Sequence, residues 1–328
     1  MSYVLGIDGG GSKTVCVLMN EKREFLGRGE AGSANYQSVG IEAAKFSIES
    51  AINQAIIKQD SIKIDVICLG LAGVGRAKDI EIIKKIIKEI PVTQNIKSEN
   101  IIIYHDAFIA LVGGIGNDVG IVVAAGTGSI VFGRNHRGET KRVGGWGYIL
   151  GDEGGAYQIA VAGMKAALKA YDGKGISTSL VTDFKSHFGL TNIEELIEIV
   201  YRSGLGVKEI AGLAPVVDNA AFLGDEVANQ IIDNAVDELV KATSVVIDEI
   251  FVEREFLEVV TTGSVWKGKS KIWDRFVSCI NRDFADVNVI FPRFEPVYGA
   301  GLLGLGILGR NYKPQRAQRT QRKEVLEG

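Results

Sequence analysis

The sequence predicts an α/β protein made of two similar halves, and a repeated glycine-rich hairpin is the first observation behind this fold class. The apolar run Tyr3 to Ile7 leads into the turn Asp8 to Thr14 (DGGGSKT), and a second apolar run follows. Later in the chain the apolar run 119–125 leads into Gly126 to Ser129 (GTGS), which another apolar run follows. Each unit has the pattern of a strand, a tight turn and a strand. Two copies of it indicate two half-molecules of similar design.

Buried strands that alternate with helices are the second observation. Residues 65–72 and 100–104 are almost continuously apolar, as in strands that a parallel sheet buries on both faces. Apolar side chains recur at helical spacing in residues 41–59 and 78–90. The 328 residues, 46% hydrophobic and 23% charged, provide enough material for two domains with separate cores.

The elements expected along the chain continue this alternation. In order they are a three-stranded meander (3–31), helix 41–59, strand 65–72, helix 78–90, strand 100–104, a helix from about 107, the hairpin 119–132, strand 141–143, helix 153–171, a mostly helical segment (177–250) ending in a long helix (225–251), strand 256–260, a helix to about 284, strand 287–291 and a last helix to 308.

A polar, glycine-rich bridge at 113–118 (GGIGND) predicts a hinge between the halves. The predicted domains are therefore 1–113 and 114–297, the second with a helical insertion, and a C-terminal helix at 298–311 is expected near their interface. The basic tail, 312–328, lacks apolar periodicity and is expected to be disordered.

Bulk properties exclude several classes of function. A net charge of -3 provides no general basic field to attract nucleic acid. The three cysteines lie far apart in the sequence and there are three histidines, so a disulfide framework, a zinc site or an iron–sulfur cluster has little to build from. No apolar stretch reaches the ~18 residues of a membrane span, and the N-terminus lacks a secretory signal. We therefore expect a cytoplasmic protein with no membrane or nucleic-acid partner.

The two glycine turns are candidate phosphate sites. Glycine has no Cβ, so backbone N–H groups in such turns can point at an anion and approach it closely. Neither turn matches the Walker pattern or opens a helix, so β-turn amides would hold the phosphates. Asp8 lies at the end of the first apolar strand and faces the first turn. It is either a turn-capping residue or, as we favour, a ligand of Mg²⁺, direct or through water.

Asp106 is the candidate general base. It lies at the carboxyl end of a predicted parallel strand, where open α/β sheets bind ligands, and its carboxylate can accept the proton of a substrate hydroxyl. The alternative is a helix N-cap for a helix that begins near Ala107. The adjacent His105 points to the opposite face of the strand and is expected to pack rather than to catalyse. Asn35, in the loop before a helix, is a turn residue or N-cap on local evidence alone.

A dense run of glycines at 144–156 surrounds Trp146, Asp152 and Glu153. Acidic residues just before a helix also interact favourably with the helix dipole, so Asp152 and Glu153 could have a purely structural role. So many glycines around one tryptophan indicate a loop that lies against a small ligand, with one of the acids bonding its hydroxyls.

Six segments in combination resemble the N-acetylglucosamine kinases, in the BadF/BadG-type ATPase branch of the actin-like and sugar-kinase superfamily. They are GIDGGGSKT, IIIYHDA, VVAAGTGS, GGWGYILGDEGGAY, TTGSVWKG and PVYGAGLLG, and they follow in the family's order from Tyr3 to about Gly309. The resemblance implies two ribonuclease-H-like domains with ATP and a sugar in the cleft between them.

The resemblance also implies roles for individual residues. Asp106 is implied as the general base, and Asp8 as the residue near Mg²⁺. The implied phosphate contacts are Gly10, Gly11, Ser12, Lys13 and Thr14 in the first turn and Gly126, Thr127 and Gly128 in the second. Gly263 and Ser264 correspond to the adenosine motif. The implied sugar contacts are Asn35, Asp106, Ser129, Gly145, Trp146, Gly147, Asp152 and Glu153.

The implied activity is transfer of phosphate from MgATP to an amino sugar, at its 6-hydroxyl, by a homodimer. N-acetylglucosamine is favoured, and glucosamine, N-acetylmuramic acid and N-acetylmannosamine stay open because loop shape decides among them. One alternative is an activator ATPase of an acyl-CoA dehydratase or reductase, although no cysteine lies in a glycine loop between the domains. Another is a non-catalytic sugar sensor. A zinc-bearing sugar kinase is disfavoured because its Cys-rich motif is absent.

Overall fold

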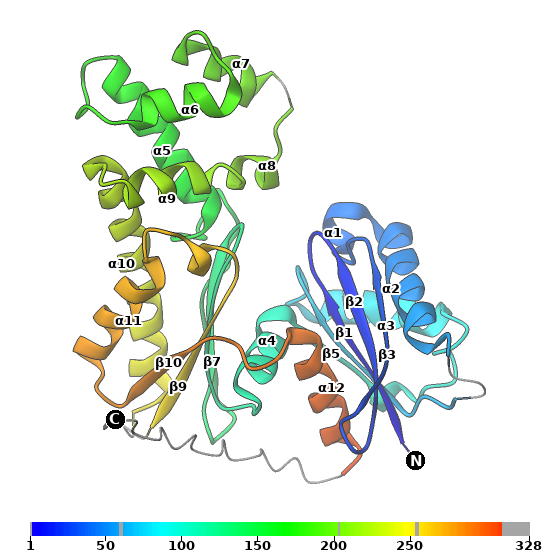
Figure 1. Cartoon of the computed structure of the whole chain (residues 1–328). Coiled ribbons are helices and arrows are strands. Elements are labelled where there is room, and N and C mark those ends of the chain that lie inside the picture. Colours follow the sequence, from blue (N-terminus) through cyan, green and yellow to red (C-terminus); the bar gives the residue numbers. More distant parts are fainter. Residues whose placement is uncertain (1, 59–61, 203, 253–255, 310–328) are drawn as a thin grey trace, which may run out of the picture.

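The computed structural model describes residues 2–58, 62–202, 204–252 and 256–309 (Figure 1). The tail expected to be disordered, 312–328, lies outside the described residues. In the part that is described, no helix is both long and apolar enough to cross a membrane.

The first sheet has five strands in the order β3-β2-β1-β4-β5. Its strands are β1 (Tyr3–Gly9), β2 (Thr14–Asn20), β3 (Phe25–Ala31), β4 (Val66–Leu71) and β5 (Ile101–His105). Strands β1, β2 and β3 form an antiparallel meander, and β4 and β5 continue the sheet from β1 in parallel. The expected meander and the two buried strands are confirmed.

The second sheet repeats this topology in the order β10-β9-β6-β7-β8. Its strands are β6 (Gly120–Ala125), β7 (Ser129–Arg134), β8 (Thr140–Gly144), β9 (Leu257–Thr262) and β10 (Val287–Ile290). Strands β6, β7 and β8 are antiparallel, while β9 and β10 extend the sheet from β6 in parallel. An antiparallel three-strand meander extended by two parallel strands is the ribonuclease-H-like arrangement. Its occurrence twice confirms the predicted fold class.

Helices surround both sheets. They are α1 (Tyr36–Val39), α2 (Ile41–Ile56), α3 (Ala77–Glu89), α4 (Asp106–Ile115), α5 (Ala156–Tyr171), α6 (Leu180–Phe188), α7 (Leu196–Tyr201), α8 (Val207–Ala211), α9 (Ala214–Phe222), α10 (Glu226–Ile250), α11 (Ile272–Asp283) and α12 (Pro296–Ile307), with short 3-10 turns η1 (Ser98–Asn100), η2 (Ile193–Glu195) and η3 (Val265–Lys267). Helices α6 to α9 form a layer above the second sheet (Figure 1). We call the first sheet with its helices the first lobe, and the second sheet with α5 to α11 the second lobe.

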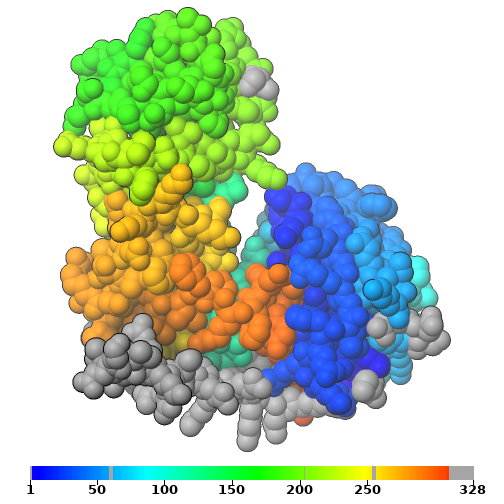
Figure 2. Space-filling model, viewed as in Figure 1, coloured from blue at the N-terminus to red at the C-terminus, as the bar shows by residue number. Residues whose placement is uncertain are grey.

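Two helices connect the lobes. Helix α4 leaves the first sheet and packs its apolar side chains on Val122, Phe132 and Val260 of the second. Helix α12 returns after β10 and lies against α4 and β1 (Figure 1). A methyl group at Gly6 of β1 would lie 2.6 Å from the backbone nitrogen of Gly301 in α12, so glycine is required for this approach. A hollow separates the lobes above this junction (Figure 2).

Candidate active site

The first glycine turn connects β1 and β2 and projects from the first lobe. Gly10 N donates to Lys13 O (2.9 Å), which closes the turn and leaves Gly11, Ser12 and Lys13 exposed at its tip. Thr14 is fully buried, and its hydroxyl donates to Gly32 O (2.7 Å). The exposed tip is therefore free to meet an anion, whereas the Thr14 hydroxyl already has a backbone partner.

The second glycine turn, between β6 and β7, is fixed by the start of α5. Gly126 N donates to Gly128 O (2.9 Å), while Ala156 N donates to Gly126 O (2.8 Å) and Tyr157 N to Thr127 O (3.0 Å). The carbonyl groups of the turn therefore satisfy the first N–H groups of the helix. A methyl group at Gly126 would meet no atom within 4 Å, so space is open on that side of the turn.

The third glycine turn lies directly on the second. Gly263 has φ +109°, and a methyl group there would lie 2.5 Å from the carbonyl carbon of Ala125 and 2.9 Å from Gly126 N. Only glycine fits this conformation and this contact. The structure thus brings together the residues predicted for phosphate and for adenosine, Gly126 to Gly128 and Gly263 to Ser264.

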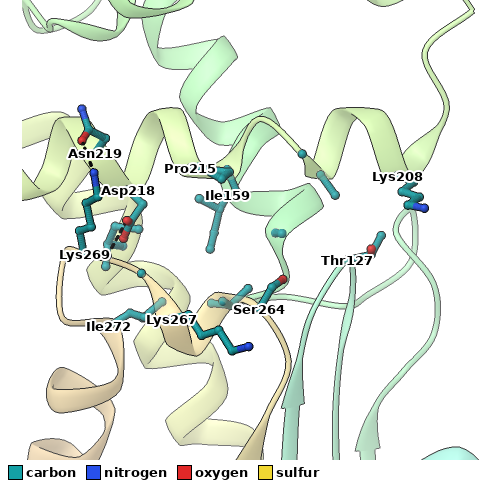
Figure 3. A pocket seen from close by; sticks show the side chains of 17 residues that line it. Thr127, Ile159, Lys208, Pro215, Asp218, Asn219, Ser264, Lys267, Lys269 and Ile272 are labelled. Carbon is teal, nitrogen blue, oxygen red and sulfur yellow. Dashed lines mark hydrogen bonds between the residues drawn. The ribbon is translucent and has the colours of Figure 1, made fainter. Parts of the chain in front are cut away.

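A cavity of about 430 Å³ opens beside these two turns. Its walls come from α5, α8, α9, η3 and the start of α11. In Figure 3, Ser264 and Lys267 line the lower wall, Pro215 the upper wall, and Thr127 and Lys208 one end. The volume is in the range of small-ligand pockets. The cavity extends the predicted adenosine motif into a pocket that can enclose a nucleoside.

The upper wall of this cavity was missed by the sequence analysis. The Asp218 carboxylate accepts hydrogen bonds from Lys269 N (2.7 Å), Ser270 N (3.1 Å) and Ser270 Oγ (2.5 Å), so it ties α9 to the loop after η3. In the sequence, Lys267 could have been assigned to the cavity only from its position three residues after Ser264. Nothing local marks Lys208 or Asp218, because helices far away in the sequence bring them here.

Asp8 and Asp106 lie close enough to repel each other. Burial, followed by the charge of Asp106, raises the pKa of Asp8 to about 7. Burial also raises the pKa of Asp106, although Ala107 N donates to its Oδ1 (2.9 Å) and opposes the rise. The N-cap alternative for Asp106 is wrong, because α4 begins at Asp106 itself and His105 occupies the cap position.

His105 packs as expected. Its ring contacts Phe132 of β7 edge to face, with ring centroids 4.4 Å apart. Burial, and then the charge of Arg142, lowers the pKa of His105 to about 4, so the imidazole is neutral near pH 7.

The glycine-rich loop before α5 folds onto the second turn. Gly147 N donates to Asp152 Oδ1 (3.0 Å), and a methyl group at Gly128 would lie 2.7 Å from Asp152 Cγ. Asp152 has φ +61°, an uncommon conformation for a residue with a side chain, and burial raises its pKa. Backbone strain of this kind is concentrated at ligand sites. The loop thus holds one partly buried carboxylate next to the predicted phosphate turn.

Other residues predicted to contact the sugar already have protein partners. Ser129 Oγ donates to Glu153 O (2.6 Å), and Gly145 N donates to Ser129 O (3.0 Å). The Glu153 side chain and Trp146 are exposed. Asn35 caps α1 by accepting from Gln37 N (3.2 Å), which confirms the N-cap interpretation. The sugar contacts of these residues stay predictions.

The residues present are compatible with Mg²⁺ held between one carboxylate and the nucleotide. Among the described residues, no three His, Cys, Asp or Glu side chains form a group able to hold a metal. Mg²⁺ typically uses one or two carboxylates together with substrate phosphates and water, so Asp8 next to the first turn fits this requirement. A cation there would also relieve the repulsion from Asp106. The three cysteines lie elsewhere, Cys16 and Cys68 buried in the first sheet and Cys279 on α11.

Comparisons with known proteins match the chain along most of its length. Residues 5–304 match the family described as the BadF/BadG/BcrA/BcrD ATPase family. The chain is 36% identical over 305 residues to the N-acetylmuramic acid/N-acetylglucosamine kinase of Clostridium acetobutylicum, covering 92% of this chain and 98% of that protein. It is 33% identical over 313 residues to the N-acetyl-D-glucosamine kinase of Dictyostelium discoideum, covering 92% and 97% respectively.

A solved structure from Chromobacterium violaceum, provisionally named an N-acetylglucosamine kinase, has the same fold. The TM-score is 0.73 at 23% identity, and the match covers 93% of this chain and 99% of that chain.

Proposed function

Because the chain belongs to the BadF/BadG/BcrA/BcrD ATPase family, we propose that it transfers the γ-phosphoryl group of ATP to the 6-hydroxyl of an amino sugar, with N-acetylglucosamine as the favoured acceptor. The chain is an ATP-dependent sugar kinase. The proposal that the acceptor is an amino sugar rests on one observation. The chain matches each of two amino sugar kinases over 92% of its own length.

The nucleotide occupies the second lobe. Its nucleoside fills the cavity between Ser264 and Pro215, and its phosphates extend past Thr127 toward the hollow between the lobes. The support is that the cavity ends at the second glycine turn, where the space beside Gly126 is open. The exposed tip of the first turn, Gly11 to Lys13, contacts the phosphates from the other lobe. Phosphoryl transfer depends mainly on such positioning and on neutralising charge.

Asp8 is the residue of this chain that holds Mg²⁺, directly or through water. When bound there, the ion would supply positive charge that neutralises the phosphates of ATP. Without a cation, burial and the neighbouring Asp106 keep the pKa of Asp8 near 7, so its ionised form is poorly stabilised. A cation reverses this balance, since an opposite charge nearby lowers a carboxyl pKa.

Asp106 accepts the proton of the attacking hydroxyl. A general base works best when its pKa approaches the working pH, and burial moves the pKa of Asp106 in that direction. The acceptor sugar lies between Asp106 and the loop that carries Trp146 and Asp152. Asn35 contacts the sugar from the first lobe. Closure of the lobes excludes water, which would otherwise compete with the sugar as acceptor.

A coupled assay of ADP release tests the proposal. The protein is given MgATP and a panel of glucose, glucosamine, N-acetylglucosamine, N-acetylmannosamine and N-acetylmuramic acid. We expect turnover with amino sugars, highest with N-acetylglucosamine, and a product phosphorylated at O6 by NMR. No release with any amino sugar, from folded protein that binds ATP, would contradict it. Size-exclusion chromatography with light scattering tests the expected homodimer separately.

A further inference from the structure

Arg142 of β8 projects from the face of the second sheet that is turned toward the first lobe. It pairs directly with Phe132 of β7, and residues opposite each other on antiparallel strands share a face. Phe132 packs on α4 and on the ring of His105, so this face looks toward the proposed base. Lys141, the neighbour of Arg142, points the other way and forms an ion pair with Glu249 of α10 (2.6 Å).

The guanidinium group of Arg142 lies against the proposed sugar loop. Its Cζ lies 4.3 Å from the centroid of the Trp146 ring, a cation–π contact. It is also close enough to His105 to lower the pKa of that imidazole, in addition to the larger effect of burial. His105 immediately precedes α4, which begins at Asp106, so the positive charge lies near the start of this helix and against the proposed sugar loop.

This positive charge has no carboxylate partner among the residues that the structure places. Arg134 and Lys141, the nearby cations on the same two strands, each have one, in Asp118 and Glu249. Arg142 is exposed, and apart from the contact with Trp146 its guanidinium makes no hydrogen bond to a described residue, so its N–H groups are available to a ligand. Those donors are arranged as a planar fork that matches a carboxylate with two parallel hydrogen bonds.

We propose that Arg142 binds a carboxylate on the acceptor sugar, so that the substrate range of this kinase includes an acidic amino sugar such as N-acetylmuramic acid. The inference rests on the proposed function, which puts the 6-hydroxyl of the acceptor at Asp106. N-acetylglucosamine has no negative charge for a guanidinium to bind, whereas N-acetylmuramic acid has a lactyl carboxylate on O3. O3 and O6 belong to one pyranose ring, so the carboxylate and Asp106 are separated by about the width of one sugar.

The test compares two sugars in three proteins. Wild type, Arg142→Gln and the control Lys141→Gln are assayed with N-acetylmuramic acid and with N-acetylglucosamine at saturating MgATP. We expect Arg142→Gln to lower kcat/KM for N-acetylmuramic acid about 10- to 100-fold, as for loss of a hydrogen bond to a charged group. Its kcat/KM for N-acetylglucosamine should stay within about threefold of wild type. Lys141→Gln should leave both sugars unaffected, because Lys141 faces α10.

Several results would overturn the inference. Wild type that phosphorylates N-acetylglucosamine but not N-acetylmuramic acid would refute it and leave the proposed function intact. An equal loss with both sugars would mean that Arg142 only positions Trp146, and a raised KM for ATP would assign it to the nucleotide. Calorimetric titration of both sugars into wild type and Arg142→Gln tests the inference even without turnover. If wild type and Arg142→Gln bind N-acetylmuramic acid with equal affinity, the inference is refuted.

Discussion

Alanine at Gly126 separates a structural glycine from one that a ligand requires. A methyl group at Gly126 would meet no protein atom within 4 Å, and Gly126 is not among the residues with positive φ. The folded protein should therefore accept Gly126→Ala without loss of stability. If the backbone of this turn holds ATP phosphates, the methyl group instead occupies space that the phosphates need. Overpacking of this kind costs about 1–3 kcal/mol, which weakens ATP binding about 5- to 150-fold.

The assay combines calorimetric titration with thermal unfolding. MgATP and adenosine are titrated separately, and Gly126→Ala should weaken MgATP much more than adenosine, because the nucleoside lies beyond the turn. Gly263→Ala is the matched contrast. There a methyl group would lie 2.5 Å from the backbone of Ala125 at φ +109°, so that variant should unfold at lower temperature. Wild-type affinity of Gly126→Ala for MgATP would refute the assignment of this turn to the phosphates.

Two further predictions concern charged side chains of the proposed site, Asp8 beside the first glycine turn and Lys267 in the wall of the cavity. Asp8→Asn should raise the free energy of unfolding at pH 8 relative to wild type, by up to about 4 kcal/mol, in urea titrations without Mg²⁺ or nucleotide. The folded-state pKa of Asp8 is raised to about 7 from 3.8, so the stability from its protonated form is complete below about pH 4 and is lost as the pH rises through 7. A stability difference that does not grow between pH 4 and pH 8 would contradict this environment for Asp8. We also propose that the ammonium group of Lys267, which lines the cavity, contacts a phosphate of ATP. Lys267→Met should then weaken ATP binding about two- to fivefold while sparing adenosine, as for one partly screened ion pair. Lys269→Met is the control, since Lys269 Nζ lies 3.5 Å from Asn219 Oδ1, and equal effects of the two variants would reject a phosphate contact for Lys267.

Local patterns were sufficient for most of the fold. The helix expected at 225–251 is α10, Glu226–Ile250, because apolar residues recur along it at helical spacing. The helix expected from about residue 153 instead begins at Ala156. The left-handed backbone of Asp152 and the tight approach of Gly155 to Gly128 keep the preceding residues in a turn.

The turns of the candidate site could be recognised from a recurring motif in the sequence, whereas contacts between distant segments could not. The glycine turns were recognised because the same pattern occurs twice. Thr14 was predicted to contact phosphate and Ser129 to contact the sugar, yet the hydroxyls of both donate to backbone carbonyls of other loops, Gly32 and Glu153. The cavity proposed for the nucleoside depends on α8 and α9 folding over η3, and no local pattern in the sequence reports such a contact.

Replacing Asp106 with asparagine tests the central claim most directly, because the variant keeps the shape of the side chain and removes the base. Single-turnover and steady-state rates with MgATP and N-acetylglucosamine are measured alongside sugar affinity by calorimetry. General-base catalysis contributes about 10²- to 10⁴-fold, so kcat should fall by that factor while the affinity for the sugar changes little. A variant that retains near-normal kcat would contradict the role of Asp106 and the mechanism built on it.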